Sequence, residues 1–219
     1  MKIGIIGAGH LGASLARLAA ARGCKVMISN SGTAESLQPL AASIPCAAAS
    51  AKEAARCDVV FLGIPFKNIF SMDPSLFTGR ILVDANNYYP DRDGKIARLD
   101  NRQATTSELV QEHFPSATVV KAFNAILARD LDIRQIALAP KRALPMAGDD
   151  GASKMAVADL HEKFGFDVVD AGTLQDSWRF ERAKPAYCIP LGRLEMESAL
   201  AQAQKHVELP HGSWRKPGH

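Results

Sequence analysis

The chain has 219 residues, of which 47% are hydrophobic and 22% are charged, and its formal net charge is +3. This composition excludes a disordered protein, and no stretch approaches the roughly 20 apolar residues of a membrane span. The balanced charge, without a run of Lys or Arg, argues against a nucleic acid partner. Only a few apolar residues precede the first glycines, too few for a signal peptide, and the four cysteines form no metal-ligand pattern. We therefore expect a cytoplasmic protein without a metal site.

Short apolar runs alternate with helical patterns along the chain. Strands are predicted at residues 2–6, 25–29, 46–48, 58–63, 80–85, 117–123, 142–147 and 166–170. Helices are predicted at residues 10–22, 33–43, 151–164 and 190–207, and capping boxes predict further helix starts at 50–53 and 105–108. A long polar loop is predicted at 86–104.

Apolar strands separated by helices are typical of a parallel sheet that is covered on both faces. Because crossovers are right-handed, this pattern predicts a Rossmann α/β fold. We expect a doubly wound, mostly parallel sheet with a small C-terminal αβ extension and a C-terminal helix. The predicted division is a dinucleotide-binding domain at 1–125, an extension completing the sheet and the substrate pocket at 126–190, and a helix and tail at 191–219. The last residues, 211–219, are predicted to be poorly ordered.

The first strand-to-helix turn carries a Gly-x-Gly-x-x-Gly motif formed by Gly7, Gly9 and Gly12. Gly7 permits the tight turn, Gly9 lets the backbone approach a pyrophosphate, and Gly12 lets helix and strand pack closely. The free N–H groups and the positive end of the helix dipole then face the phosphates. His10 and Leu11 lie inside this turn, and His10 is predicted to be a side chain at the cofactor mouth rather than an acid–base group or a ligand.

The end of the second strand indicates which dinucleotide is bound. Sites for NAD usually place an acid there, on the ribose 2′-hydroxyl, but this chain has Ser29, Asn30, Ser31 and Thr33, with no acid before Glu35. Hydroxyl groups and a following helix N-terminus can donate to a 2′-phosphate, which a carboxylate would repel. The loop therefore favours NADP. Alternatively, Ser31 or Thr33 caps the next helix, and one residue can do both.

Further ligand-binding loops are expected at the carboxyl ends of the other strands. The predicted cofactor contacts in these loops are Gly63, Ile64, Pro65, Asn86 and Ala122. The predicted substrate pocket is lined by Asn87, Phe123, Asn124 and Trp178, with Asn124 hydrogen-bonding a carboxamide or a flat heterocycle. Lys121 lies in an otherwise apolar strand. It is either a catalytic lysine or, as is more common, a strand-edge lysine in an ion pair.

Six segments, in this order, resemble the F-420-dependent NADP oxidoreductase family, and the resemblance spans nearly all of residues 1–190. They are residues 1–9, 29–31, 83–87, 119–124, 147–150 and 170–174. The resemblance implies a compact Rossmann domain with a small C-terminal αβ piece, usually as a homodimer. It also implies hydride transfer between a nicotinamide and a deazaflavin. Similar domains in six-transmembrane metalloreductases pass electrons to a flavin instead.

The chain departs from this family at two places. Family members often carry Arg in the 2′-phosphate loop, where this chain has Asn30 and Gly32, and an Arg of the C-terminal motif is replaced by Trp178. Trp178 either stacks on an aromatic ring system or is simply buried.

The sequence therefore predicts an NADP(H)-dependent oxidoreductase that transfers a hydride to a small-molecule electron acceptor, either F-420 or a flavin (FMN or FAD). Such a transfer needs little acid–base help, so no catalytic residue is assigned. The alternatives are a non-catalytic NADP(H) sensor and a reductase of a small imine or carbonyl compound.

Overall fold

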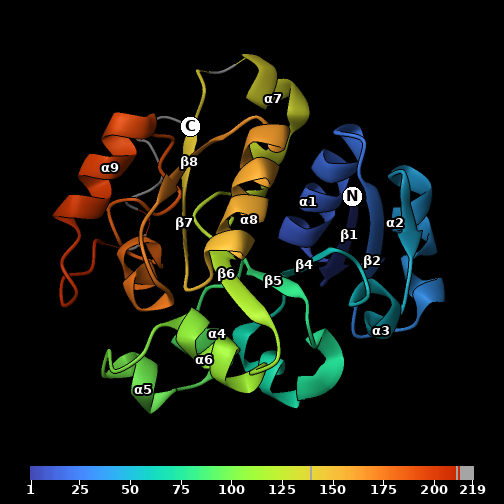
Figure 1. The fold of residues 1–219 in the computed structure, drawn as a ribbon, viewed down its shortest axis with the longest axis horizontal. Helices are drawn as coiled ribbons and strands as arrows, with labels where there is room; N and C mark the ends of the chain where they lie inside the picture. Colours follow the sequence, from blue (N-terminus) through green and yellow to red (C-terminus); the bar gives the residue numbers. More distant parts are fainter. Residues whose placement is uncertain (139, 211, 213–219) are drawn as a thin grey trace.

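The computed structural model describes residues 1–138, 140–210 and 212. One eight-stranded sheet forms the centre, in the order β3-β2-β1-β4-β5-β6-β7-β8 (Figure 1). The strands are β1 (Lys2–Ile6), β2 (Lys25–Ser29), β3 (Cys46–Ala48), β4 (Val59–Leu62), β5 (Ile81–Asp84), β6 (Thr118–Ala122), β7 (Ala143–Gly148) and β8 (Asp167–Asp170). Neighbours pair in parallel except β6 and β7, which are antiparallel. The mostly parallel α/β sheet expected from the sequence is confirmed.

The connections between the strands contain α-helices and 3-10 helices. The α-helices are α1 (His10–Ala21), α2 (Gln38–Ser43), α3 (Ala51–Ala54), α4 (Pro90–Asp93), α5 (Ala97–Asp100), α6 (Thr106–His113), α7 (Ile133–Leu138), α8 (Gly151–Phe164) and α9 (Arg193–Gln202). The 3-10 helices are η1 (Ala34–Leu37), η2 (Phe66–Ser71), η3 (Pro74–Phe77), η4 (Ala128–Leu131) and η5 (Leu174–Phe180). Both predicted capping boxes are present, at Ser50 with Glu53 and at Thr105 with Glu108.

Three predicted elements differ from the structure. The loop at 86–104 contains α4 and α5, because Pro90 occupies the first turn of α4, a position where its fixed φ favours a helix. The helix predicted at 33–43 is divided into η1 and α2, since Pro39 cannot donate a backbone hydrogen bond within a continuous helix. The last helix ends at Gln202, well before residue 207. The predicted tail lies outside the described residues, except for Gly212.

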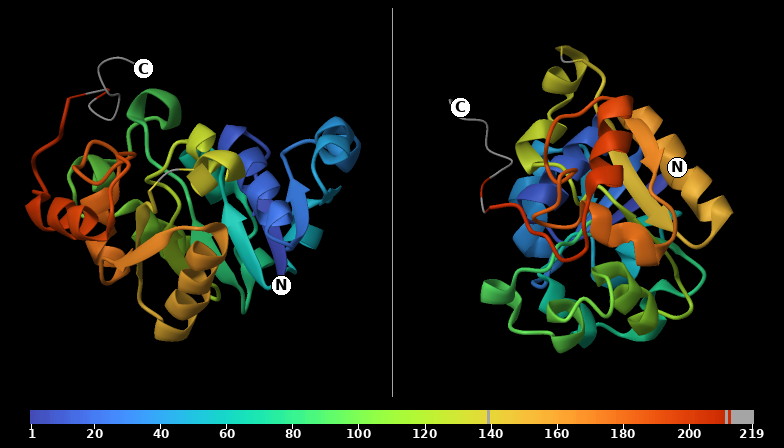
Figure 2. Two further views of the ribbon diagram at one scale, coloured as in Figure 1. Left: turned by 90° about the horizontal axis from the view of Figure 1, so that it is seen from above. Right: turned by 90° about the vertical axis from the view of Figure 1, so that its left-hand side faces the viewer.

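Side chains alternate between the two faces of the sheet, and each face has its own core. Ile3 and Ile5 of β1 pack in a cluster with residues of α1 and α8, whereas Ile6 packs in a second cluster with residues of α6. A third cluster lies between β7, η5 and α9. Figures 1 and 2 show α2 and α9 at opposite ends of the sheet. The two strands from residues 126–190, β7 and β8, therefore continue the same sheet and share its core.

The order of the strands places one topological switch point in the sheet. From β1 the chain moves outward to β2 and β3, and it then returns to β4 on the other side of β1. The loops that follow β1 and β4 therefore diverge to opposite faces. In open α/β sheets, ligands bind at the carboxyl ends of the strands where such a divergence occurs.

Candidate functional site

The three glycines after β1 have three different surroundings. Gly7 has a φ of +110°, and a Cβ there would collide with the carbonyl oxygen of Gly63. A Cβ on Gly12 would collide with the carbonyl oxygen of Gly7, so this glycine permits the close packing of α1 on β1. A Cβ on Gly9 would meet no atom within 4 Å. Gly7 and Gly12 are therefore required by the fold itself, whereas the space in front of Gly9 is open to a ligand.

The N-terminus of α1 differs from those of α3, α6 and α8. Those three helices are capped by Ser50, Thr105 and Asp150, each of which accepts a hydrogen bond from a backbone N–H of the first turn. Gly9 has no side chain that could cap α1, and the first turn of α1 contains no acidic residue. The first N–H groups of a helix need an acceptor, and they bind phosphate oxygens well. The end of α1 thus fits the pyrophosphate of a dinucleotide.

The loop after β2 presents hydroxyl groups. Ser29 is buried, its Oγ lies 3.4 Å from the carbonyl oxygen of Ile5, and its own carbonyl accepts the N–H of Gly7. Ser31 and Thr33 are exposed. Ser29 therefore supports the glycine turn from below the surface, whereas the side chains of Ser31 and Thr33 are exposed to solvent.

A local hydrogen-bond network fixes the shape of this loop. The side chain of Asn30 accepts the N–H of Gly32 at 2.9 Å and donates to Ser36 Oγ at 3.1 Å. Hydrogen bonds from its own backbone and from the Thr33 hydroxyl lower the pKa of Glu35. Thr33 precedes η1 without a side-chain cap to the helix backbone. Ser31, rather than Thr33, is therefore the hydroxyl that has no partner among the described residues.

Asn86 holds the turn after β4. Its Oδ1 accepts the N–H of Ile64 at 2.8 Å, and its Nδ2 donates to Asp84 Oδ1 at 2.8 Å. Asn86 and Ala122 are both buried. The amide of Asn86 is therefore engaged within the protein, where it positions the turn that begins at Gly63 and Ile64.

Lys121 is fully buried in the middle of the sheet. It lies on β6 in register with Asp84 of β5, and Nζ donates to Asp84 Oδ2 at 3.0 Å. Nζ also donates to the carbonyl oxygen of Asn86 at 2.6 Å and to Thr106 Oγ1 at 2.9 Å. The predicted ion pair is present, but the strand is central and not an edge, because β7 pairs with β6. With all three N–H donors used, Lys121 fixes the Asn86 loop rather than transferring protons.

Asn124 joins two segments that are distant in sequence. Its Nδ2 donates to Asn87 Oδ1 at 3.2 Å and to the carbonyl oxygen of Phe180 at 3.0 Å. In return, Asn87 Nδ2 donates to the carbonyl oxygen of Asn124 at 3.0 Å. Asn124 Oδ1 is buried and has no hydrogen-bond partner among the described residues. Oδ1 is thus a buried acceptor whose hydrogen-bonding capacity is unused by the described residues.

Phe123 is a core residue, and its prediction as a pocket residue is wrong. It is 1% exposed, and its ring stacks on that of His161 with 4.2 Å between the centroids. Its left-handed φ of 59° interrupts the alternation of β6, so that Phe123 packs in the same cluster as Ala122. This backbone conformation is rare for a bulky residue and is not visible as a local sequence signal.

Trp178 lies on η5 and is half-buried. The ammonium of Lys184 lies 5.5 Å from the centre of its ring. Lys184 also donates to the carbonyl oxygens of Gln204, Lys205 and Val207, at 2.8, 3.1 and 2.7 Å. Of the two alternatives for Trp178, the structure shows partial burial, with a cation over the ring.

Sequence reasoning missed a pair of tyrosines. Tyr89 follows Asn87 and Tyr88 in the loop after β5, and its hydroxyl lies 2.7 Å from that of Tyr187. Burial raises the pKa of Tyr187. The guanidinium carbons of Arg92 and Arg182 lie 4.8 and 5.8 Å from the centre of the Tyr89 ring. The sequence feature that could have indicated this pair is the position of Tyr88 and Tyr89, shortly after the carboxyl end of β5.

The glycine turn, the uncapped α1 and the switch point together define a dinucleotide-binding protein of the Rossmann class. The family model for coenzyme F420-dependent NADP oxidoreductases matches residues 2–88. A hypothetical protein from Sinorhizobium meliloti is similar in structure, with a TM-score of 0.74 and 32% identity, covering 87% of this chain and 95% of that one. The match to this family model covers the part of the chain from β1 to the loop after β5.

Two further proteins are similar to the chain. A putative F420-dependent NADP-reductase from Arthrobacter sp. FB24 has a TM-score of 0.68 and 23% identity, covering 81% of this chain and 87% of that one, which shows the shared fold. Metalloreductase STEAP3 of Rattus norvegicus is 29% identical over 199 residues, covering 86% of this chain. The chain spans 38% of the length of that metalloreductase. Within the described residues, no helix has both the length and the hydropathy needed to cross a membrane.

Proposed function

We propose that this protein binds NADP(H) and transfers a hydride between the nicotinamide and a planar acceptor, either a flavin or the deazaflavin F-420. The observation that carries the proposal is the uncapped N-terminus of α1 beside the open space at Gly9. Both lie at the switch point of the sheet, next to the turn after β4. A pyrophosphate there would receive the free N–H groups of α1.

The loop after β2 supports NADP as the cofactor. Ser31 is exposed at its tip, and the chain has no acid between Ser29 and Glu35. Hydrogen bonds to a charged group are worth about 1.5–3 kcal/mol each, so a few hydroxyl and N–H donors could hold a 2′-phosphate without an arginine. Glu35 is the nearest acid in the sequence, and its carboxylate is engaged by Thr33 and its own backbone.

The chemistry of the proposed reaction needs orientation more than proton transfer. When bound, NADPH supplies the hydride, and the protein holds both rings in place. Asn86 positions the turn after β4, and Asn124 holds together the segments of Asn87 and Phe180. Lys121 has no free donor, and burial lowers the pKa of His161 to about 4 within the core. Neither is placed as an acid or base for a ligand.

The test is steady-state kinetics with the purified protein. Oxidation of NADPH is followed with FMN, with F-420 and without acceptor, and each assay is repeated with NADH. We expect oxidation that depends on an acceptor and a lower KM for NADPH than for NADH. Tight NADPH binding with reduction of neither acceptor would contradict the reductase and favour a non-catalytic sensor.

We also propose that the protein is a homodimer, as the family resemblance implies. Sedimentation of the same sample tests this proposal.

A further inference from the structure

Two segments meet at Asn124, and they carry charged side chains that have no role in the site described above. One is the loop that continues from Asn87 into α4, and the other is the chain from η5 to Tyr187. Asn124 Nδ2 binds both of them, through Asn87 Oδ1 and the carbonyl oxygen of Phe180. A second contact between the segments is the hydroxyl pair of Tyr89 and Tyr187, 2.7 Å apart. We name the junction of these two segments the seam.

The seam contains two arginines on one aromatic ring. Arg92 and Arg182 lie with their guanidinium carbons 4.8 and 5.8 Å from the centre of the Tyr89 ring. Arg92 is paired with Asp93, to which its Nε and Nη2 donate at 3.0 and 2.8 Å, and Nη2 also donates to the carbonyl oxygen of Asn87. Arg182 has no carboxylate within 4.0 Å in the part of the chain that the structure describes. One guanidinium charge at this ring is therefore not neutralised.

The other charged groups of the seam have partners of their own. Glu181, its neighbour in sequence, accepts the N–H and the hydroxyl of Thr106, at 2.8 and 2.6 Å. Lys184 adds a second cation, which is hydrogen-bonded to three backbone carbonyl oxygens and lies within the field of Glu208 and Glu181. Two cations, Arg182 and Lys184, thus lie within three residues of each other along the chain.

This arrangement suits a planar oxyanion. A guanidinium that lies over an aromatic ring keeps its N–H groups free at the edge, and those groups match phosphate and carboxylate oxygens. Tyr89 is itself held by Tyr187, so the ring that supports both arginines is fixed before a ligand arrives. Because Arg92 is paired with Asp93, the charge available to an anion at this ring is that of Arg182.

We propose that Arg182, supported by Arg92 and Tyr89, binds an anionic group of the electron acceptor. This inference rests on the proposed function and specifies the substrate class. The acceptor is a planar heterocycle whose side chain carries a phosphate or a carboxylate. The ring lies toward Asn124, and the anion lies at Arg182. FMN and the acidic side chain of a deazaflavin share this chemistry, whereas riboflavin has the ring without the anion.

The experiment compares FMN with riboflavin at saturating NADPH. Wild type is expected to have the higher kcat/KM for FMN, and Arg182→Gln is expected to reduce it roughly tenfold while leaving riboflavin unchanged, as for the loss of one charge-assisted hydrogen bond. Arg182→Lys should keep part of the preference. Added salt should weaken the preference for FMN in wild type. Thermal unfolding of each variant identifies a general loss of structure.

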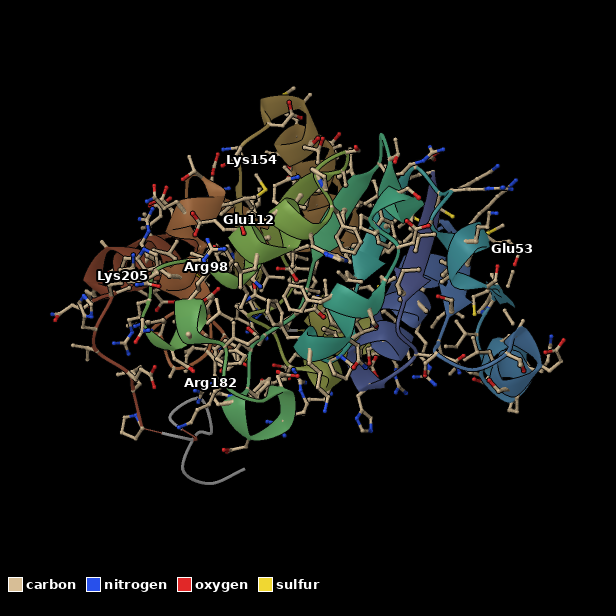
Figure 3. The ribbon with its side chains drawn as sticks, turned by 90° about the horizontal axis from the view of Figure 1, so that it is seen from below. Glu53, Arg98, Glu112, Lys154, Arg182 and Lys205 are labelled. Carbon is tan, nitrogen blue, oxygen red and sulfur yellow. The ribbon has the colours of Figure 1, made fainter. Side chains whose placement is uncertain are left out.

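A matched control is Arg56→Gln. Arg56 is an exposed arginine that follows α3, the helix of Glu53. Figure 3 shows Glu53 at one end of the molecule and Arg182 well away from it, on the other side of the centre. Both variants lose one positive charge. If the preference for FMN comes from Arg182 and not from the net charge of the protein, the control variant should keep the wild-type preference.

The outcomes separate this inference from the proposed function. Equal kcat/KM values for FMN and riboflavin in wild type, or equal losses for both in Arg182→Gln, would overturn the anion site while leaving the reductase intact. If wild type reduces neither acceptor, the proposed function fails, and fluorescence titrations of FMN and riboflavin then decide the site. Tighter binding of FMN that is lost in Arg182→Gln supports it, and equal binding overturns it.

Discussion

Lys121→Met removes the cation of a buried ion pair in the centre of the sheet. The side chains of Lys121 and Asp84 are both 0% exposed, and Nζ makes three hydrogen bonds. Ser107 Oγ and the backbone and side-chain N–H groups of Asn86 would remain as donors to Asp84. The carboxylate would thus stay hydrogen-bonded, but its charge would lose its counter-ion. Breaking a buried pair in this way costs about 3–5 kcal/mol.

The assay is equilibrium unfolding in urea. For a slope near the upper end of the usual range, this cost lowers the urea midpoint by roughly 1–2 M. Lys141→Met is the matched control, because Lys141 pairs with Asp167 at 2.6 Å with its side chain 55% exposed, and such surface pairs are worth about 0–1 kcal/mol. A loss in Lys121→Met no larger than in this control would refute the reasoning.

A double variant tests whether the loss comes from the charge left behind. Lys121→Met combined with Asp84→Asn removes both charges, and the amide can still accept from Asn86. We expect the double variant to lose less than the sum of the two single variants, with a coupling energy of about 1–3 kcal/mol. Additive losses would mean that the two residues act independently, contrary to their 3.0 Å contact.

Three further predictions concern the glycine turn, the loop after β2 and the core. Gly9→Val should abolish NADPH binding in calorimetry without lowering the melting temperature, whereas Gly12→Ala should destabilise the fold, because only the second substitution meets protein atoms. Ser31→Asp should weaken NADP binding much more than NAD binding, since it sets a carboxylate beside the proposed 2′-phosphate, and equal losses would contradict that site. Burial lowers the pKa of His161 from 6.5 to about 4, so the unfolded chain binds the extra proton first as the pH falls. Stability should therefore decrease between about pH 6.5 and pH 4, by up to about 3 kcal/mol, and His161→Leu should remove that part of the pH dependence in urea unfolding.

The sequence by itself determined the elements whose causes are local. The glycine turn, the two capping boxes and the end of α8 at Gly165 each depend on residues within a few positions of one another. The apolar strands were equally clear, because a strand buried on both faces is apolar throughout. These local signals were enough to predict the Rossmann fold and the position of the glycine turn after β1.

The tertiary structure decided the parts that depend on distant residues. Lys121 meets Asp84, which is 37 residues away, only because β5 and β6 pair in one register. Tyr89 meets Tyr187 across 98 residues, and Arg182 reaches the ring of Tyr89 from that same distant segment. Phe123 turned into the core through its own left-handed backbone, against the alternation of its strand. A sequence pattern reports the preferences of neighbouring residues, whereas pairing register and packing choose which distant groups share a site.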